Sequence, residues 1–488
     1  MADTALQIGI IGAYMVVALG IGLFAYRLTD RTAEDYYLAS RTLGTGVLLF
    51  TTFATLLSAF TFFAGPNISY GAGPEWILVM GLMDGVVFGI LWYVLGYKQW
   101  LVGKAHGYVT LGEMLGDRFG SRGLRVLVAA ISIFWLFPYV MLQQQGAGTA
   151  IAALTGGAVP YWVGAGGVTL FMIAYVALSG MRGVAWTDTL QGAFMLVMVW
   201  AAFAWVAAAV GGVGAATATL GDVEGNFLKL GGGLYTPTYV LSTAISIAFG
   251  VTMFPQVNQR FFVADSKAVL KRTLPLWPVL VVLLFVPAFM LGAWARGLGI
   301  AAGSADNVLP LLLGEYTPAW FAALVVAGAM AAMMSSSDSM LLSGSSYFTR
   351  DVYRPLVAEA TEEREAFLGR VGVAAFAALS FVASLFRPAT LLEIGDTAFG
   401  GFAQLALPVA VALYWSGTTR WGIYVGISGS QLFYLASVFL PQVPGTYLGG
   451  WSASIVGMVL GLALTVGVSA LTSPAPEEDA SVYATRAD

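Results

Sequence analysis

The chain of 488 residues is 58% hydrophobic and only 10% charged, and its mean hydropathy is +0.81. Apolar runs of about twenty residues recur along nearly the whole chain, which excludes an ordinary soluble domain and a transmembrane β-barrel and predicts an all-α polytopic membrane protein. The absence of cysteine excludes disulfides and thiolate chemistry, and the net charge of −4 gives no sign of nucleic-acid binding.

Hydropathy predicts thirteen spans, and their odd number places the termini on opposite sides of the membrane. The first run has no basic segment before it, so we expect it to be a retained helix and not a signal peptide. The predicted spans cover about residues 7–25, 46–65, 76–97, 124–152, 161–179, 187–210, 238–259, 274–295, 318–347, 368–386, 396–415, 421–440 and 450–471.

The basic residues are sorted between alternate loops. Of the 22 Lys and Arg residues, all but Lys229, Arg296 and Arg387 fall on one side, with Arg260 counted among the loop residues and none in the middle of a span. The positive-inside rule then places the N-terminus outside and the C-terminus in the cytoplasm, for a multi-pass protein of the plasma (inner) membrane.

Two spans are interrupted at corresponding places. Gly65-Pro66-Asn67 bends or ends the second span, and Phe254-Pro255-Gln256 interrupts the seventh. Paired breaks are typical of two related five-helix halves in inverted orientation, in which unwound backbone binds ions and solute; structural proline kinks are the alternative. The expected organisation is an extra helix and cytoplasmic loop (1–45), a first repeat (46–210), an external loop (211–237), a second repeat (238–416), two further helices (417–471) and a disordered tail (472–488).

Hydroxyl groups and one carboxylate lie within the ninth span. Ser336, Ser339, Ser343 and Ser346 follow a helical spacing that makes one polar stripe, and Asp338 lies beside it. Packing of helices through small residues would explain the serines alone, but it has no use for a carboxylate. The stretch therefore favours a bound polar ligand.

Several stretches together resemble the sodium/solute symporter family. The resemblance is closer to the monocarboxylate and pantothenate branches than to the proline or glucose branches. The stretches that carry it, in chain order, are residues 35–41, 106–110, 137–143, 186–191, 259–266, 332–336, 347–353 and 398–402. The resemblance implies about thirteen spans with a 5+5 inverted-repeat core of the leucine-transporter type.

The resemblance also implies a sodium ion between the second and ninth spans. Matched motif to motif, three backbone carbonyls and two hydroxyls would hold it: those of Ala54, Leu57, Ala332, Ser335 and Ser336. Proline carriers of the family have an aspartate where this chain has Leu56, which argues against proline as the solute.

Three acidic residues are candidates for a second cation or proton site: Asp188, Asp338 and Asp84. Asp188 matches an aspartate linked to a second cation in sugar carriers of the family, although a carboxylate at a helix start is also a good cap. For Asp84, in the middle of the third span, protonation, pairing with a hydroxyl and a part in proton movement are the open alternatives.

For the solute, the resemblance points to the interrupted spans and to a polar wall in the fourth span. The candidate residues are Thr61, Phe62, Gln143, Phe254 and Gln256. We expect a sodium-coupled symporter of a small organic anion such as a monocarboxylate or pantothenate, with the bilayer, sodium and the solute as partners. An amino acid or sugar symporter, a proton-coupled carrier and a transporter-like sensor remain alternatives; no nucleophile or metal cluster suggests an enzyme.

Overall fold

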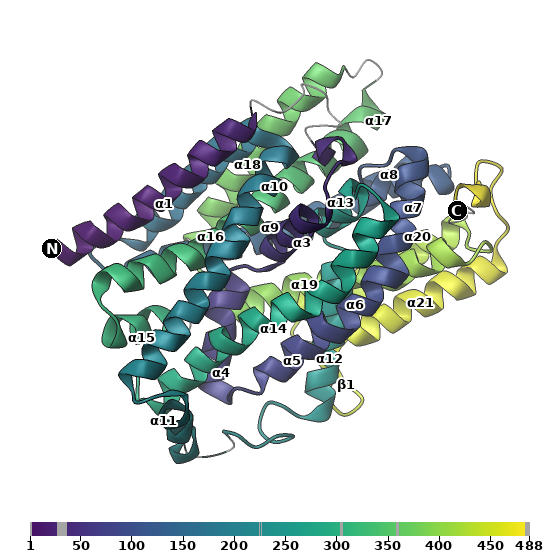
Figure 1. The fold of residues 1–488 in the computed structure, drawn as a ribbon. Helices are drawn as coiled ribbons and strands as arrows, with labels where there is room; N and C mark the ends of the chain where they lie inside the picture. Colours follow the sequence, from purple (N-terminus) through teal and green to yellow (C-terminus); the bar gives the residue numbers. More distant parts are fainter. Residues whose placement is uncertain are drawn as a thin grey trace.

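A helix satisfies its own backbone hydrogen bonds, so a chain that crosses hydrocarbon folds into helices. The computed structural model describes residues 2–26, 37–223, 225, 227–302, 306–357 and 361–483, and these are very largely helical (Figure 1). The predicted all-α class is confirmed. Residues 27–36 of the first loop, which include the start of the 35–41 stretch, lie outside the described part.

The first half of the described chain begins with α1 and reaches the long loop before residue 237. Its elements are α1 (Ala2–Tyr26), η1 (Ala39–Arg41), α3 (Thr45–Leu56), η2 (Phe60–Ala64), α4 (Gly65–Ala72), α5 (Trp76–Leu82), η3 (Met83–Val87), α6 (Phe88–Leu91), η4 (Trp92–Gly96), α7 (Tyr97–His106), α8 (Leu111–Arg118), α9 (Arg122–Leu154), α10 (Tyr161–Ala209), α11 (Val213–Ala218) and η5 (Thr219–Asp222).

The second half repeats the pattern of a broken span followed by long helices. Its elements are α12 (Pro237–Thr252), α13 (Pro255–Val263), α14 (Lys267–Gly297), α15 (Val308–Tyr316), α16 (Ala319–Tyr347), η6 (Phe348–Tyr353), α17 (Arg354–Leu356), α18 (Glu362–Ser384), α19 (Leu391–Tyr414), α20 (Arg420–Phe439), β1 (Thr446–Tyr447), β2 (Trp451–Ser452), α21 (Ala453–Leu471) and η7 (Ala480–Tyr483).

The spans agree with the predicted ones in number and place. Within the described residues, ten helices are long and apolar enough to cross a membrane, or twelve if each of two bent helix pairs is one span. The shorter apolar helix Tyr161–Val176 accounts for the remaining predicted span. It is separated from the sixth span at Gly180, whose φ of 59° and ψ of −165° give a backbone conformation that glycine adopts readily.

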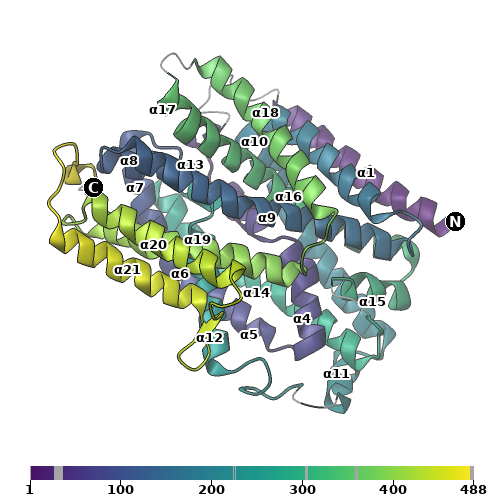
Figure 2. The same cartoon turned by 180° about the vertical axis from the view of Figure 1, so that it is seen from behind.

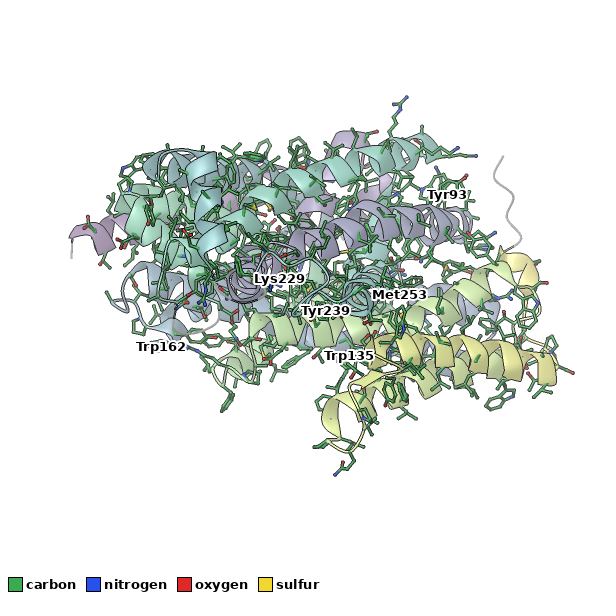
Figure 3. All side chains as sticks on the ribbon, turned by 90° about the horizontal axis from the view of Figure 1, so that it is seen from below. Tyr93, Trp135, Trp162, Lys229, Tyr239 and Met253 are labelled. Carbon is green, nitrogen blue, oxygen red and sulfur yellow. The ribbon has the colours of Figure 1, made fainter. Side chains whose placement is uncertain are left out.

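The long helices run roughly side by side, and the two ends of the chain lie at opposite ends of the bundle (Figures 1 and 2). This agrees with an odd number of spans. Large side chains such as Tyr93 and Trp162 project from its outer edge (Figure 3), as expected of a surface facing lipid. Among the ten unbroken spans of the described residues, the one that contains the serine-bearing α16 is the most enclosed, with 83% of its apolar segment buried.

The segment after Thr472, which the sequence predicts to be disordered, packs against the helix ends as far as Tyr483. The Tyr483 hydroxyl donates to the Met114 carbonyl oxygen at 2.7 Å, and Lys98 Nζ donates to the carbonyl oxygen of Tyr483 at 2.6 Å. Burial raises the pKa of Tyr483, which keeps this hydroxyl a donor. Hydropathy misses the docking because it depends on one aromatic ring and on polar contacts such as the ion pair of Arg420 with Glu477. Residues 484–488 lie outside the described part.

Candidate ion and solute site

The second span is broken between α3 and η2. Leu57 has extended backbone angles (φ −87°, ψ 126°), and the axis of the span bends by 60°. Gln143 Oε1 accepts a hydrogen bond from the Ala59 N–H at 2.9 Å, and Ser58 Oγ accepts one from the Phe60 N–H at 3.2 Å. These side chains satisfy the amides at the break, and the helical bonding of nearby carbonyls is interrupted.

The two serines of α16 face this break. Ser335 Oγ donates to the Ala54 carbonyl at 2.8 Å and to its own helix at the Ala332 carbonyl at 3.0 Å. Ser336 Oγ donates to the carbonyls of Leu57 at 2.8 Å and Thr55 at 3.0 Å. The structure thus brings together all five groups predicted to bind sodium.

The donor set at this position consists of oxygen atoms only. It combines backbone carbonyls with two neutral hydroxyls, all fully or almost fully buried. Oxygen ligands suit hard cations such as sodium, and each serine hydroxyl could turn its hydrogen away to offer a lone pair. The residues present therefore fit a small monovalent cation.

The seventh span is broken in a corresponding way, between α12 and α13, with a bend of 57°. Pro255 is the first residue of α13, where its missing N–H is not needed. Asn258 Nδ2 donates to the carbonyls of Thr252 at 3.1 Å and Phe254 at 2.9 Å, so one amide caps the end of α12. In both interrupted spans, a buried amide side chain therefore forms hydrogen bonds with the backbone at the break.

A buried ion pair joins α13 to α10 below the serines. Arg260 Nη2 lies 3.0 Å from Asp188 Oδ2, and both side chains are fully buried. Thr51 Oγ1 donates to the same carboxylate oxygen at 2.6 Å, and Arg260 also donates to Ser339 Oγ at 2.5 Å. The polar stripe of α16 is thus continuous with an ionic cluster.

This cluster corrects two expectations. Arg260 is not a loop residue, because it lies within α13 and its guanidinium enters the protein core. Asp188 does not cap a helix, because the break in α10 is at Gly180, two turns earlier. The distribution of the other basic residues is unaffected.

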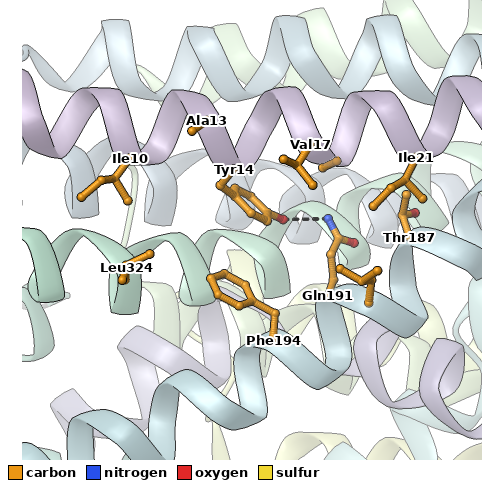
Figure 4. A pocket seen from close by; sticks show the side chains of 11 residues that line it. Ile10, Ala13, Tyr14, Val17, Ile21, Thr187, Gln191, Phe194 and Leu324 are labelled. Atoms are coloured by element: carbon orange, nitrogen blue, oxygen red, sulfur yellow. Dashed lines mark hydrogen bonds between the residues drawn. The ribbon is translucent and has the colours of Figure 1, made fainter.

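Asp338 is fully buried on α16, and in the described part of the chain neither of its carboxylate oxygens has a hydrogen-bond partner. Asp188 is a charged neighbour. On the outer side, α1 covers this region: Gln191 Nε2 donates to the Tyr14 hydroxyl at 2.8 Å across an apolar groove (Figure 4). Asp338 and Asp188 therefore belong to one enclosed region, whereas Asp84 lies elsewhere.

Asp84 lines a separate small cavity next to the two helix breaks. The cavity has a volume of about 20 Å³, room for roughly one water molecule. Of the predicted solute-binding residues, Thr61 and Phe254 line it. The full lining is Leu56, Leu57, Phe60, Thr61, Met80, Met83, Asp84, Tyr139, Val251, Phe254, Phe285 and Phe399.

Three predicted solute-binding residues lie outside this lining. Gln143 is engaged at the Ala59 amide, where it supports the break. Phe62 is on the π-helical turn η2 and is buried away from the cavity, and Gln256 is buried on α13, where its amide has no hydrogen-bond partner among the described residues. The family resemblance, and not contacts, suggested these three residues, and their part in solute binding stays a prediction.

Comparison with known proteins agrees with this arrangement. The model of the sodium:solute symporter family matches residues 36–429. The chain belongs to this family. It is a transporter and not an enzyme, as the sequence predicted.

Relatives of this symporter carry different solutes. The sodium/pantothenate symporter of Escherichia coli (strain K12) is 29% identical, over 89% of this chain and 93% of the relative. The high-affinity proline transporter PutP of Bacillus subtilis (strain 168) is 26% identical, over 90% and 94% of the two chains. The monocarboxylate transport permease protein of Rhizobium johnstonii is 25% identical, over 96% of each.

Solved structures share the fold. A Na+-coupled sialic acid symporter in a substrate-bound outward-open state has a TM-score of 0.81 at 20% identity, covering 96% of this chain and 98% of that chain. The transporter MhsT in complex with L-phenylalanine has a TM-score of 0.57 at 13% identity, covering 88% and 99%. The predicted inverted-repeat core of the leucine-transporter type is confirmed.

Sequence reasoning missed the pairing of Arg260 and most of the aromatic cavity lining. Tyr139 and Phe399 fall in stretches that carry the family resemblance, but nothing in their spacing indicates that they face one another. In the structure their ring centroids are 5.2 Å apart. In the sequence, this part of the protein was indicated by the charge of Asp84 inside an apolar run and by the solute-binding candidates Thr61 and Phe254.

Proposed function

We propose that this protein is a sodium-coupled symporter that imports a small organic solute by alternating access, with sodium bound by Ala54, Leu57, Ala332, Ser335 and Ser336. The observation that carries the proposal is the convergence of two buried hydroxyls on the carbonyls of a broken span. Five neutral oxygens hold a monovalent cation without neutralising it, which permits its release.

Coupling between ion and solute follows from shared residues. The Leu57 carbonyl belongs to the proposed sodium site. Leu57 also lines the small cavity that contains Asp84, called the central cavity from here on. Sodium would replace the hydroxyl–carbonyl hydrogen bonds and fix the extended backbone of Leu57. An ion that orders one wall of a cavity changes the affinity of the solute there, and the solute changes the affinity of the ion by the same factor.

The role of the acidic residues in ion coupling stays a prediction. Arg260 already neutralises Asp188, so Asp338 is the acid of this cluster that is left for a second cation or a proton. Asp84 lines the small cavity beside the helix breaks and lies outside this cluster. A proton-coupled carrier is the second candidate function, and transport driven by a pH gradient in sodium-free buffer would favour it.

The sequence predicts that the solute is an organic anion such as pantothenate or a monocarboxylate. The sodium/pantothenate symporters of Escherichia coli and Haemophilus influenzae support pantothenate as the first solute to test. The proline transporters among the relatives keep amino acids as the alternative.

Replacing Ser335 or Ser336 by alanine tests the ion site. Each variant should raise the sodium concentration that gives half-maximal thermal stabilisation of the purified protein by about tenfold, equivalent to ~1.4 kcal/mol for one lost ligand. Ser337→Ala is the matched control, because Ser337 Oγ donates only within its own helix, to Met333 at 2.8 Å. Unchanged sodium dependence in both variants would remove the proposed site.

Transport itself is tested in proteoliposomes. An inward sodium gradient should drive uptake of the true solute, and an equal potassium gradient should not. Uptake that is indifferent to sodium contradicts the coupling, and binding without uptake identifies a sensor.

A further inference from the structure

We propose that the transported solute carries a positively charged nitrogen, held in the central cavity by the carboxylate of Asp84 and by surrounding aromatic rings. The inference rests on the proposed function, because it names the class of solute for the same site. It departs from the organic anion favoured by the sequence.

Asp84, like Asp338, is a buried acid without a cationic partner among the described residues, and it is the acid that lines the small cavity beside the two helix breaks. Asp188 pairs with Arg260 at 3.0 Å, and Asp351 pairs with Arg125 at 2.8 Å. No ion pair reaches Asp84 from any of the described residues, and the neighbouring polar side chain is the neutral indole of Trp277. A carboxylate that is 4% exposed and faces a cavity is costly to bury unless it takes up a proton or a cation binds beside it.

The other walls of the cavity are aromatic. Phe254 stacks on Phe399 with centroids 5.4 Å apart and planes 10° apart, and Tyr139 meets each of them edge-on at 5.2 Å. Phe60 meets Phe399 edge-on at 5.2 Å from the opposite half of the fold. Ring faces carry partial negative charge and attract ammonium groups, above all quaternary ones.

The same lining offers an anion no positive charge, and its hydroxyls are those of Thr61 and Tyr139. It contains no Lys, Arg or His, and the Tyr139 hydroxyl is already engaged with Ser58 at 3.0 Å. A carboxylate entering the cavity would face Asp84 at low dielectric, where like charges repel strongly. A cation or a zwitterion with its ammonium group toward Asp84 meets no such barrier.

The cavity is closed in this structure. With space for about one water molecule, it admits a solute only after the rings move apart. Phe254 lies in the break between α12 and α13, and Phe399 lies on α19, so binding requires this break and α19 to separate at the stacked pair. The rings that recognise the nitrogen are thus the ones that close over it.

A ligand panel on the purified full-length protein tests the inference. Choline, glycine betaine and L-proline carry a charged nitrogen, and pantothenate and lactate are anions without one. In sodium buffer, at least one of the first group should raise the unfolding temperature, and neither anion should. Stabilisation by the anions alone, or by none of the three nitrogen compounds, overturns the inference.

Variants of Asp84 provide a second test of the inference, in which binding of the nitrogen compound is measured. Asp84→Asn should weaken binding of the stabilising nitrogen compound on the order of tenfold or more, because a charge-assisted contact is lost. Asp84→Glu should retain part of the affinity. Asp396→Asn is the matched control, since Asp396 lines a different pocket between α12, α19 and α20. Equal affinity in wild type and Asp84→Asn overturns the assignment.

Stabilisation by sodium separates this inference from the proposed function. If sodium stabilises the wild type and only the anions bind, the symport proposal stands and the nitrogen assignment fails. If sodium has no effect on stability, the proposed ion site fails whichever solute binds. Should Asp84→Asn not fold, the wild-type panel and Asp84→Glu still decide the outcome.

Discussion

At the residue scale, the most informative side chains are fully buried and can still accept a hydrogen bond or bind a cation. Ser335 and Ser336 donate to backbone carbonyls at a helix break, and Asp338 is buried beside them without a hydrogen-bond partner in the described part of the chain. A buried carboxylate without a partner, such as that of Asp338, destabilises the closed fold relative to a fold that holds a ligand. The polar residues of α16 therefore favour ion binding over simple helix packing.

The pair formed by Asp188 and Arg260 makes a prediction about stability. Arg260→Gln leaves the Asp188 carboxylate buried without a compensating charge, and it should lower the free energy of unfolding by about 3–5 kcal/mol. The double variant Asp188→Asn with Arg260→Gln should recover much of this loss, because no charge is then stranded. Thermal unfolding of the purified variants measures both effects.

A surface ion pair provides the control. Glu477→Gln removes the charge of the largely exposed partner of Arg420, and it should change the unfolding temperature little. A double variant as unstable as Arg260→Gln alone would show that Arg260 stabilises the fold through its packing and not through its charge.

At the element scale, each break lies against another helix. The break of the second span meets α16, and Phe254, in the break of the seventh span, stacks on Phe399 of α19. The bends of 60° and 57° are nearly equal, as expected of related halves. Each break lies where the chain stops using helical hydrogen bonds and side-chain amides take over. The breaks thus supply the polar backbone from which an ion and a solute site can be built.

Close packing of α12 on α19 makes a second prediction. A Cβ added at Gly250 would lie 2.2 Å from the Phe399 carbonyl oxygen, and neither backbone can move without separating the helices. Gly250→Ala should destabilise the closed state by about 1–3 kcal/mol and reduce solute uptake, because the stacked rings that close the cavity are displaced. Uptake and thermal unfolding of the same variant measure both effects.

Gly81→Ala is the control for this substitution, since a Cβ at Gly81 has no atom within 4 Å. It should leave stability unchanged or slightly improved, because alanine is the better helix former. If Gly250→Ala behaves in the same way, the closed packing of α12 on α19 does not limit transport.

At the scale of the whole molecule, orientation in the membrane is set by charge and can be tested directly. The chain has no cysteine, so single cysteines can be introduced without background. Lys229→Cys should react with a membrane-impermeant maleimide in intact cells, whereas Lys271→Cys should react only after permeabilisation. Both side chains are exposed, and the opposite pattern would reverse the predicted topology.

The sequence by itself determined the membrane class, the places of the thirteen spans, the two breaks and the family. These follow from local composition and from contiguous motifs, because an apolar segment in hydrocarbon must satisfy its backbone hydrogen bonds within its own helix. The five residues of the proposed sodium site were also predicted, because the family motif keeps them in two short stretches of the chain.

Only the tertiary structure decided which polar groups meet. Arg260 reads as a loop residue until α13 brings it to Asp188, 72 positions away. Asp84 is one charge in an apolar run until Tyr139, Phe254 and Phe399 close around it. Long-range pairing depends on how helices pack, which periodicity does not encode, and so the chemistry of the solute cavity became visible only in the folded molecule.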